Sequence, residues 1–456
     1  MLTAARNRMA TLFASGYDVI NSTGKRKAAS TAITHEDQQL KERDRRRLIG
    51  TGQHLQRNFS IVAWAVRKHL DYVTQFDFQM RTEDEQFNQQ VERLWAEWSR
   101  PGNCDVAGRH PLPKMLRMME ARRTLDGDCF LLKRSQGRLQ AIESDRIRTP
   151  DDIEPGQIWH NGALVNKDGR VQRWGVHDRI GGNRYELSRQ VIASNIIQHA
   201  CFERFDQVRG ISPLSAAYNS FQDVSESVDF ALAKMKVEQM FALVITNGSS
   251  DGYGEHTKVG DSYDVDFGKG GAVKLEMDPG DDAKFLKSDN PSTATQEFIH
   301  TVIGMAIKAL DLPFNFYDES HTNFFGSRAA WLLYDRSCIS KRADILELLR
   351  KLTIWRLQLW IQDGVIRLPA GTSLRDIQFE WIHRGMPWWD PAKEISGNIA
   401  AISAGLDTPQ RICRSTGTDF ETNVKQIAKA KALAAEHDVD LSFAIEEPTG
   451  VDDDEN

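Results

Sequence analysis

The chain has 456 residues, which is enough for two to four domains of ordinary size. A hydrophobic fraction of 40% and a charged fraction of 27% are those of an ordinary globular protein, and no uninterrupted apolar run approaches the ~20 residues of a membrane helix. The formal net charge of −6 argues against a protein that coats nucleic acid, because neutralising phosphates requires a surplus of Lys and Arg. We therefore expect a soluble protein of the cell interior. If this protein meets DNA, we expect it to guide the DNA without gripping it.

The cysteines are odd in number and widely scattered, and no two of them form a CxxC pair. This pattern encodes neither a zinc knuckle nor a disulfide framework, so we expect free thiols in a reducing cytoplasm. The five positions are Cys104, Cys129, Cys201, Cys338 and Cys413.

The N-terminal region begins with residues 1–35, which are rich in Ala, Ser, Thr and Lys and indicate a flexible arm. A polar helix is expected over residues 35–57, and an apolar helix over residues 58–73. The run Arg45-Arg46-Arg47 in the polar helix could contact nucleic acid, but a solvated helix face or a subunit contact is the favoured interpretation.

A mixed α+β region follows. Residues 113–124 predict a helix, and the turn at Asp126-Gly127 leads into a short buried strand that ends near Leu132. Further strands are expected over residues 139–143, 171–176 and 196–200.

Helices dominate after Gly210. A long helix is expected over residues 213–243, with one apolar stripe, and a second helix ends near residue 310. Between them, the glycine-rich residues 246–290 predict a small β insertion. The two stripes consist of Phe221, Val224, Val228, Ala231 and Met235 in the first helix, and Phe298, Val302, Met305 and Ala309 in the second.

A polar loop over residues 311–326 precedes the longest predicted helix, residues 327–362, in which apolar residues recur every seven positions. A short β segment precedes Pro387, and residues 391–436 are expected to be helical. The final residues, 442–456, form an acidic tail that we expect to be disordered.

No catalytic motif is present. The glycines at 268–271 lack the Walker A pattern and indicate a hairpin turn, and no GxSxG or HExxH sequence occurs. Asp264 and Asp266 could hold a divalent ion, but a solvent-facing strand is the favoured interpretation. His321 is the histidine with the strongest case for a function, and an ordinary loop residue remains an equal alternative. We expect no enzyme, no metal and no cofactor.

Four segments, in order, resemble the lambda-type portal family of tailed bacteriophages. Residues 43–58 are similar to its arginine-rich helix that ends in Arg-Asn, and residues 121–130 resemble its "R..L..GE.F" turn. Residues 142–147 resemble "IE.DRI", and residues 195–214 resemble "viH.....Q.RG.spl" before a long helix. Beyond residue 214 the resemblance rests on the order of helices and loops, and Asp311-Leu312-Pro313 follows the "lgvP" pattern only loosely.

The resemblance implies an α+β portal fold with an α/β wing, a two-helix stem, a small β-rich clip, a long wing helix and a helical crown. These domains would be the arm (1–35), wing (36–210), stem helix (211–245), clip (246–290), second stem helix (291–310), tunnel loop (311–326), long helix with the remaining wing (327–388), crown (389–441) and acidic tail (442–456).

The resemblance also implies a function: a homo-oligomeric ring, expected to be a dodecamer, at the capsid vertex, through which double-stranded DNA is packaged and ejected. The implied partners are DNA without sequence specificity, terminase, the major capsid or scaffolding protein, and head-tail connector or adaptor proteins. The protein would lie in the virion, and in the host cytoplasm during assembly. Another capsid-associated connector or minor head protein, and a nucleic-acid enzyme, are the alternatives.

The loop between the two helices is the candidate DNA contact. A buried segment would not tolerate its polar side chains without partners, and weak phosphate contacts need no base recognition. The candidate residues are Asn315, Asp318, Ser320, His321 and Asn323. We expect the phenylalanines around them (Phe314, Phe316, Phe324 and Phe325) to pack against a neighbouring subunit or the helix bases.

Overall fold

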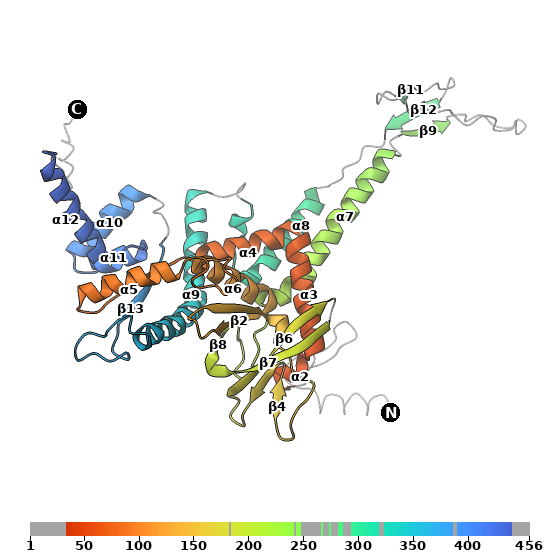
Figure 1. Cartoon of the computed structure of the whole chain (residues 1–456). Helices are drawn as coiled ribbons and strands as arrows, with labels where there is room; N and C mark the ends of the chain where they lie inside the picture. Colours follow the sequence, from red (N-terminus) through yellow and green to blue (C-terminus); the bar gives the residue numbers. More distant parts are fainter. Residues whose placement is uncertain are drawn as a thin grey trace, which may run out of the picture. The chain divides into compact units, whose positions relative to one another are not determined.

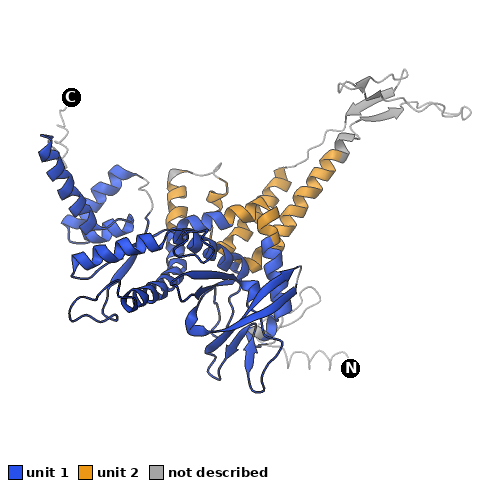
Figure 2. Cartoon of the chain, in the orientation of Figure 1, with its two compact units in different colours: residues 1–53, 66–213, 335–456 blue, residues 54–65, 214–334 orange. Residues whose placement is uncertain are grey.

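The computed structural model describes residues 33–181, 184–240, 243–247, 266–267, 273–274, 281–285, 293–318, 323–385 and 390–439 (Figure 1). The chain divides into two compact units, which are coloured separately in Figure 2. Unit 1 comprises residues 1–53, 66–213 and 335–456, and unit 2 comprises residues 54–65 and 214–334. No described helix is both long and apolar enough to cross a membrane.

The chain begins with helices, of which α3, α4 and α6 fall where the sequence predicts helices. The helices are α2 (Glu36–Gln39), α3 (Glu42–Asn58), α4 (Ser60–Val73), α5 (Glu85–Trp98) and α6 (Leu112–Asp126), with strand β1 (Phe76–Met80) between α4 and α5. Residues 54–65, the end of α3 and the start of α4, belong to unit 2. Helix α6 ends because Gly127 adopts φ +93°, a left-handed conformation that glycine tolerates. Strand β2 therefore starts one residue later, at Asp128.

Two antiparallel sheets form the centre of unit 1. One sheet has the order β3-β2-β8 and the other has the order β4-β5-β6-β7. The strands are β2 (Asp128–Lys133), β3 (Leu139–Glu143), β4 (Ile158–His160), β5 (Ala163–Val165), β6 (Val171–Gly181), β7 (Arg184–Ile192) and β8 (Ile196–Ala200), with single 3₁₀ turns η2 (Ser144–Arg146) and η3 (Ala193–Asn195).

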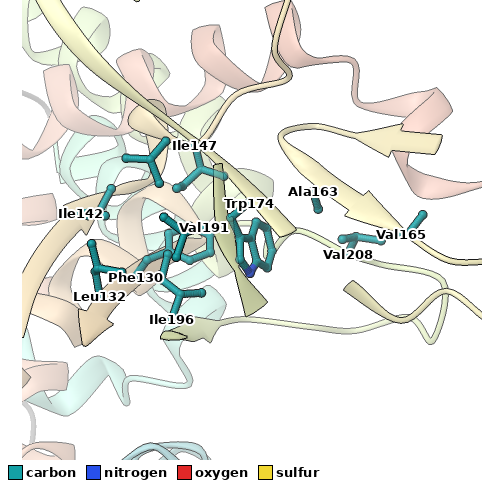
Figure 3. Packing of buried hydrophobic residues seen from close by; sticks show 11 residues of the cluster. Phe130, Leu132, Ile142, Ile147, Ala163, Val165, Trp174, Val191, Ile196 and Val208 are labelled. Atoms are coloured by element: carbon teal, nitrogen blue, oxygen red, sulfur yellow. The ribbon is translucent and has the colours of Figure 1, made fainter. Parts of the chain in front are cut away.

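The main hydrophobic core of unit 1 joins these two sheets. Phe130 of β2 meets Trp174 of β6 edge to face, with 4.9 Å between ring centroids. Figure 3 shows aliphatic side chains around the pair, including Ile142 and Ile196. Aromatic pairs of this kind contribute roughly 0.5–1.5 kcal/mol beyond the burial of their area. The core therefore fixes the position of β2, on which the buried charges described below depend.

A second, aromatic core lies where the N-terminal and C-terminal parts of unit 1 meet. Strand β1 pairs antiparallel with β13 (Phe379–His383), so that Phe78 lies opposite Trp381. Trp95 of α5 contacts Phe78, Trp381 and Trp360, the last of which lies on α9 (Phe324–Gln362). Helices α10 (Pro391–Ser403), α11 (Pro409–Ser415) and α12 (Phe420–Glu436) follow.

Unit 2 contains α7 (Tyr218–Met240) and α8 (Thr293–Ile307), which pack on each other, and the first turns of α9. The 3₁₀ turns are η4 (Pro213–Ala217), of which residues 214–217 belong to this unit, η5 (Lys308–Leu310) and η6 (Phe314–Phe316). Between α7 and α8 lie two antiparallel strand pairs, as expected for a β insertion. They are β9 (Leu243–Asn247) with β12 (Asp281–Phe285), and β10 (Asp266–Phe267) with β11 (Val273–Lys274).

Two predicted apolar stripes differ from the observed burial. Of the stripe predicted on α7, only Phe221 and Val224 are buried, and Val228 is exposed. On α8 the predicted stripe is largely exposed in the single chain: Phe298 and Met305 are each 61% exposed, because this helix turns a different face inward. The buried face of α8 and η5 consists of Ile303, Ala306, Ile307 and Leu310. By contrast, α9 confirms its heptad pattern, with Tyr334, Cys338, Ile345, Leu348 and Leu352 buried.

The interpretation of Arg45 as part of a solvated face is also wrong. Its side chain is 5% exposed and pairs with a carboxylate 83 residues away in the sequence. Arg47 is exposed, as expected. All five cysteines are free thiols.

Candidate functional site

The loop that joins α8 to α9 is the predicted site. Its first residues are fixed by local backbone structure and by burial. The helical stretch ends at Asp311, which has φ +60°, a left-handed conformation that Asp tolerates better than most residues. Leu312 is fully buried and anchors the loop beneath α8. Pro313 then precedes the 3₁₀ turn η6. The first five residues of the loop are therefore ordered by the local chain.

Two of the loop's four phenylalanines pack on the helices of unit 2, which is one of the two expected arrangements. Phe314 lies under Gly304 and contacts the ring of Tyr317, with 5.6 Å between centroids. Phe316 contacts Tyr334 of α9 edge to face. Phe325 remains 78% exposed, and the side chain of Phe324 lies outside the described set.

The polar candidates do not form one cluster in the described part of the loop. Asn315 is half-buried in η6, and Asp318 lies 3.7 Å from Nδ1 of His300. Asn323 accepts a hydrogen bond from the backbone N–H of Gly326 at 2.6 Å, so it caps the start of α9. Ser320 and His321 lie outside the described residues.

His300 is a neighbour of the loop that the sequence analysis did not single out. Its ring contacts Phe314 and Tyr317, and Tyr317 also meets Trp64 edge to face. Burial raises the pKa of Tyr317, so its hydroxyl stays protonated near neutral pH. One signal in the sequence could have indicated the contact between His300 and the loop. His300 and Gly304 are four residues apart on one helix, ahead of an aromatic loop.

A buried ionic cluster in unit 1 contains residues from all four segments that resemble the portal family. We call Arg45, Asp128, Ser144 and Arg209 the Asp128 cluster. Arg209 donates two hydrogen bonds to the Asp128 carboxylate, at 2.6 and 2.9 Å. Arg45 and the Ser144 hydroxyl donate two more, at 3.1 and 2.5 Å. Each of the four residues is at most 4% exposed.

The electrostatics of this cluster are those of a closed structural site. Burial alone would raise the pKa of Asp128, but Arg209 and Arg45 outweigh it and lower the pKa to about 2. Arg209 also donates to the carbonyl oxygens of Ile147 and Asn161, at 3.0 and 2.5 Å. A buried charge with this many partners is stable only while all of them are present.

A second buried cluster surrounds Glu120 on α6. Its carboxylate is fully buried and lies 2.8 Å from His69 Nε2 and 2.7 Å from His199 Nε2. Arg123 donates to the same carboxylate at 2.8 Å and also pairs with Asp344 of α9. Burial lowers the pKa of His69, more than its hydrogen bond to Glu120 raises it. This cluster ties α4, α6, β8 and α9 together.

Neither cluster is arranged for catalysis or metal binding. The carboxylates of Asp128 and Glu120 are completely enclosed by protein donors, so a substrate could not reach them. Within the described residues, no group of three or more His, Cys, Asp or Glu side chains could hold a metal ion.

The sequence matches the model of the family described as "Phage portal protein, lambda family" over residues 23–342. This match spans more than half of the chain, and the protein belongs to the lambda family of phage portal proteins. Such a protein is a structural component of the phage virion at the capsid vertex, and it is not an enzyme.

The chain is also similar to individual proteins and solved structures. A probable portal protein of Halomonas phage phiHAP-1 is 23% identical over 377 residues, which cover 76% of this chain and 70% of that protein. A chain from the virion of a native gene transfer agent particle aligns with a TM-score of 0.47 at 15% identity, and covers 82% of this chain and 93% of its own. An HK97-family phage portal protein from Corynebacterium diphtheriae aligns with a TM-score of 0.28 at 11% identity, and covers 57% of this chain and 77% of its own.

Proposed function

We propose that this protein assembles into a homo-oligomeric ring, a dodecamer in the capsid, through which double-stranded DNA is packaged and ejected. The observation that supports ring formation is the exposed apolar surface of unit 2. A single chain exposes large hydrophobic side chains on α7, α8 and the start of α9, far more than scattered surface residues would explain. These residues are Val228, Phe230, Leu232, Phe298, Met305, Phe325, Leu332 and Leu333.

A ring accounts for this exposure. Head-to-tail subunits bury two different faces of each copy, so a helix pair of one chain contacts a neighbour on either side. The neck of a native gene transfer agent particle was computed with C12 symmetry. A chain of that structure aligns with a TM-score of 0.46 at 16% identity, and covers 82% of this chain and 94% of its own. For the present protein, the dodecamer stays part of the proposal.

Within the ring, we assign the regions as the family resemblance implies. Residues 36–210 and 327–388 would form the wing, α7 and α8 the stem, residues 246–290 the clip and residues 389–441 the crown. The clip would dock terminase and then connector or adaptor proteins, while the wing would contact capsid or scaffolding protein. Deleting residues 250–286 should leave rings intact and abolish terminase docking.

The α8–α9 loop is proposed to line the narrowest part of the tunnel and to contact DNA. His300 and Asp318 hold the start of the loop on α8, and Asn323 fixes its end as a helix cap. In the sequence, Ser320 and His321 fall between these two anchors, and we propose that they contact the phosphates. Asn315 sits at the turn that leads into this span.

Ring formation tests the central proposal. Phe230→Glu places a charge on the exposed apolar surface of α7, and Ala233→Glu adds the same charge at another exposed position of that helix. We expect Ala233→Glu to form rings in negative-stain microscopy, and Phe230→Glu to lower the ring fraction at least ten-fold. Wild-type ring yield in Phe230→Glu, or wild-type protein that forms no rings, would contradict the proposal.

DNA retention tests the loop. Asn323→Ala would remove the cap of α9 as well as a DNA contact, so Asn323→Asp is the better change, because Asp keeps the cap and repels phosphate. Combined with His321→Ala, it should leave ring assembly unchanged and reduce the DNA recovered per capsid. Normal packaging and retention would exclude these side chains from the mechanism.

A further inference from the structure

The loop between β8 and η4 in unit 1 presents an aromatic side chain entirely to solvent. Phe205 is fully exposed, and Phe202, three residues earlier, is 50% exposed. Ile33, at the start of the described chain, is 95% exposed. We call these three residues the Phe205 patch. An unrestrained loop would let a phenylalanine fold back and bury part of its ring, so this exposure requires that the loop be held in place.

Hydrogen bonds hold the loop in a fixed turn. The Gln207 side chain accepts the backbone N–H groups of Glu203 and Arg204, at 2.7 and 3.1 Å. Asp206 accepts a hydrogen bond from the guanidinium of Arg204 at 3.0 Å. Phe205 therefore lies on a preorganised turn. An aromatic side chain held in this way is a good anchor for a partner segment, because little conformational entropy is lost when the segment binds.

The same turn is tied to the start of the described chain. Arg204 donates hydrogen bonds to the Glu36 carboxylate at 2.7 Å and to the carbonyl oxygen of Thr34 at 3.2 Å. The backbone N–H of Glu36 also donates to Asp206, at 3.2 Å. These bonds bring Ile33 to the turn, so the segment that precedes Ile33 in the sequence reaches unit 1 beside the Phe205 patch.

That preceding segment carries an apolar stripe in its sequence. Its members recur at spacings that would place them on one side of a helix. They are Met9, Leu12, Phe13, Tyr17 and Ile20. The linker over residues 21–32 could span up to about 40 Å, so the stripe could fold back onto the patch. The family model matches the chain from residue 23, so the stripe precedes the matched region.

The charges of this segment and of the turn are opposite. The charged side chains of the turn and of residues 33–36 are the carboxylates of Glu36, Glu203 and Asp206 and the guanidinium of Arg204. Residues 1–32 contain one carboxylate, that of Asp18, and a larger number of basic side chains. These are Arg6, Arg8, Lys25, Arg26 and Lys27. The segment over residues 440–456 is acidic and has no Lys or Arg, so its charge disfavours it as an occupant.

We propose that the apolar stripe of residues 9–20 packs on the Phe205 patch of its own chain. A linker of about this length gives an effective concentration on the order of 1 mM, which favours the chain's own segment over a separate partner. The contact buries Phe205 and covers the turn that leads into Arg209 of the Asp128 cluster. The N-terminal arm, which its composition alone would make flexible, is ordered by this patch.

Disulfide trapping in the full chain tests the contact. Leu12→Cys is combined with Glu203→Cys, beside Phe205, in a chain whose Cys201 and Cys413 are replaced by Ser, and the protein is oxidised mildly. We expect a disulfide within one chain, identified by mass spectrometry of the linked peptides. Thr11→Cys with Glu203→Cys is the matched control, because Thr11 is the neighbour of Leu12 in the sequence but lies on the side of the helix opposite the stripe. It should give at least ten-fold less disulfide.

Two outcomes of the trapping experiment would overturn the inference. One is an equal yield of disulfide for the Leu12 and Thr11 pairs. The other is a disulfide that joins two chains, detected in a mixture of isotopically labelled and unlabelled protein, because the arm would then bind a second copy.

Hydrogen exchange gives a second test. Phe205→Ser removes the anchor without removing packing within the described chain, because the ring is fully exposed. Amides of residues 9–20 should exchange at least ten-fold faster in Phe205→Ser than in the wild type. Ile180→Ser, which removes another exposed apolar side chain of unit 1, should leave their exchange unchanged. Equal exchange in the wild type and Phe205→Ser would overturn the inference. Neither test depends on ring formation, so its failure is distinct from a failure of the proposed function.

Discussion

Asp128→Asn should destabilise the protein more than any exposed charge substitution, because it leaves two buried guanidinium groups without their carboxylate. Asp128 accepts hydrogen bonds from Arg209 and Arg45, and neither arginine is more than 4% exposed. Removing one partner of a buried ion pair costs roughly 3–5 kcal/mol. The lowering of the Asp128 pKa from 3.8 to about 2 indicates an electrostatic contribution of roughly 2–3 kcal/mol, which is of the same order as that cost but smaller.

The assay is chemical denaturation followed by far-ultraviolet circular dichroism at pH 7. The control is Asp178→Asn, which removes the carboxylate of an exposed pair with Arg146, where Asp178 is 59% exposed. We expect the control to change the free energy of unfolding by at most about 1 kcal/mol. A cost for Asp128→Asn no larger than that of the control would refute the role assigned to the Asp128 cluster.

The pH dependence gives an independent check on the same residue. A carboxyl group whose pKa is lower in the folded state stabilises the protein fully above its unfolded pKa, and this contribution is lost as the pH falls through the folded pKa. For Asp128 the window runs from about pH 4 to about pH 2. The difference in stability between the wild type and Asp128→Asn should therefore shrink as the pH is lowered across that window.

Three further changes test other features of the fold. Gly210→Ala should cost at least about 2 kcal/mol and lower the thermal midpoint, because the added methyl would overlap the carbonyl oxygen of Gly127. Gly50→Ala, in α3 with no atom near the new methyl, should stabilise the protein by about 0.5–1 kcal/mol, and a loss of stability there would contradict the helix assignment. Burial, followed by the nearby Arg342, lowers the pKa of His383 to about 4, so neutral His383 should stabilise the fold above about pH 6.5 and lose this effect as the pH falls toward 4. His383→Gln should remove this part of the dependence of stability on pH. An unchanged dependence in His383→Gln would contradict the prediction.

Helices with regular apolar spacing could be predicted from the sequence, since their periodicity reflects burial within one chain. The heptad pattern predicts a helix over 327–362, and α9 spans Phe324–Gln362. Helix α5 was not predicted, although Phe87, Val91 and Trp95 form a buried face, because polar residues fill the remaining positions. Strands β4, β5 and β7 were also missed, since β4 and β5 have three residues each and β7 is mostly polar.

Predictions of which residues are buried failed where burial depends on distant parts of the chain. A run of three arginines is ordinarily solvated, and only the fold brings Arg45 to Asp128 and Ser144. The similarity to the portal family marked these segments as related, but it could not show that Arg45, Asp128, Ser144 and Arg209 meet. Of the loop candidates, the structure assigns a contact to Asp318 and a cap to Asn323, and their roles toward DNA stay predictions.

The proposed ring explains why the predicted stripe on α8 is exposed in the single chain. A helix that packs on its own chain along one face and on a neighbour along another carries apolar residues on both, so periodicity alone cannot tell which face is internal. In α8 the internal face contains Ile303 and Ile307, and the outer face contains Phe298 and Met305. Residues that look like core in the sequence and are exposed in the single chain, as in α8, are therefore the ones to expect at subunit contacts.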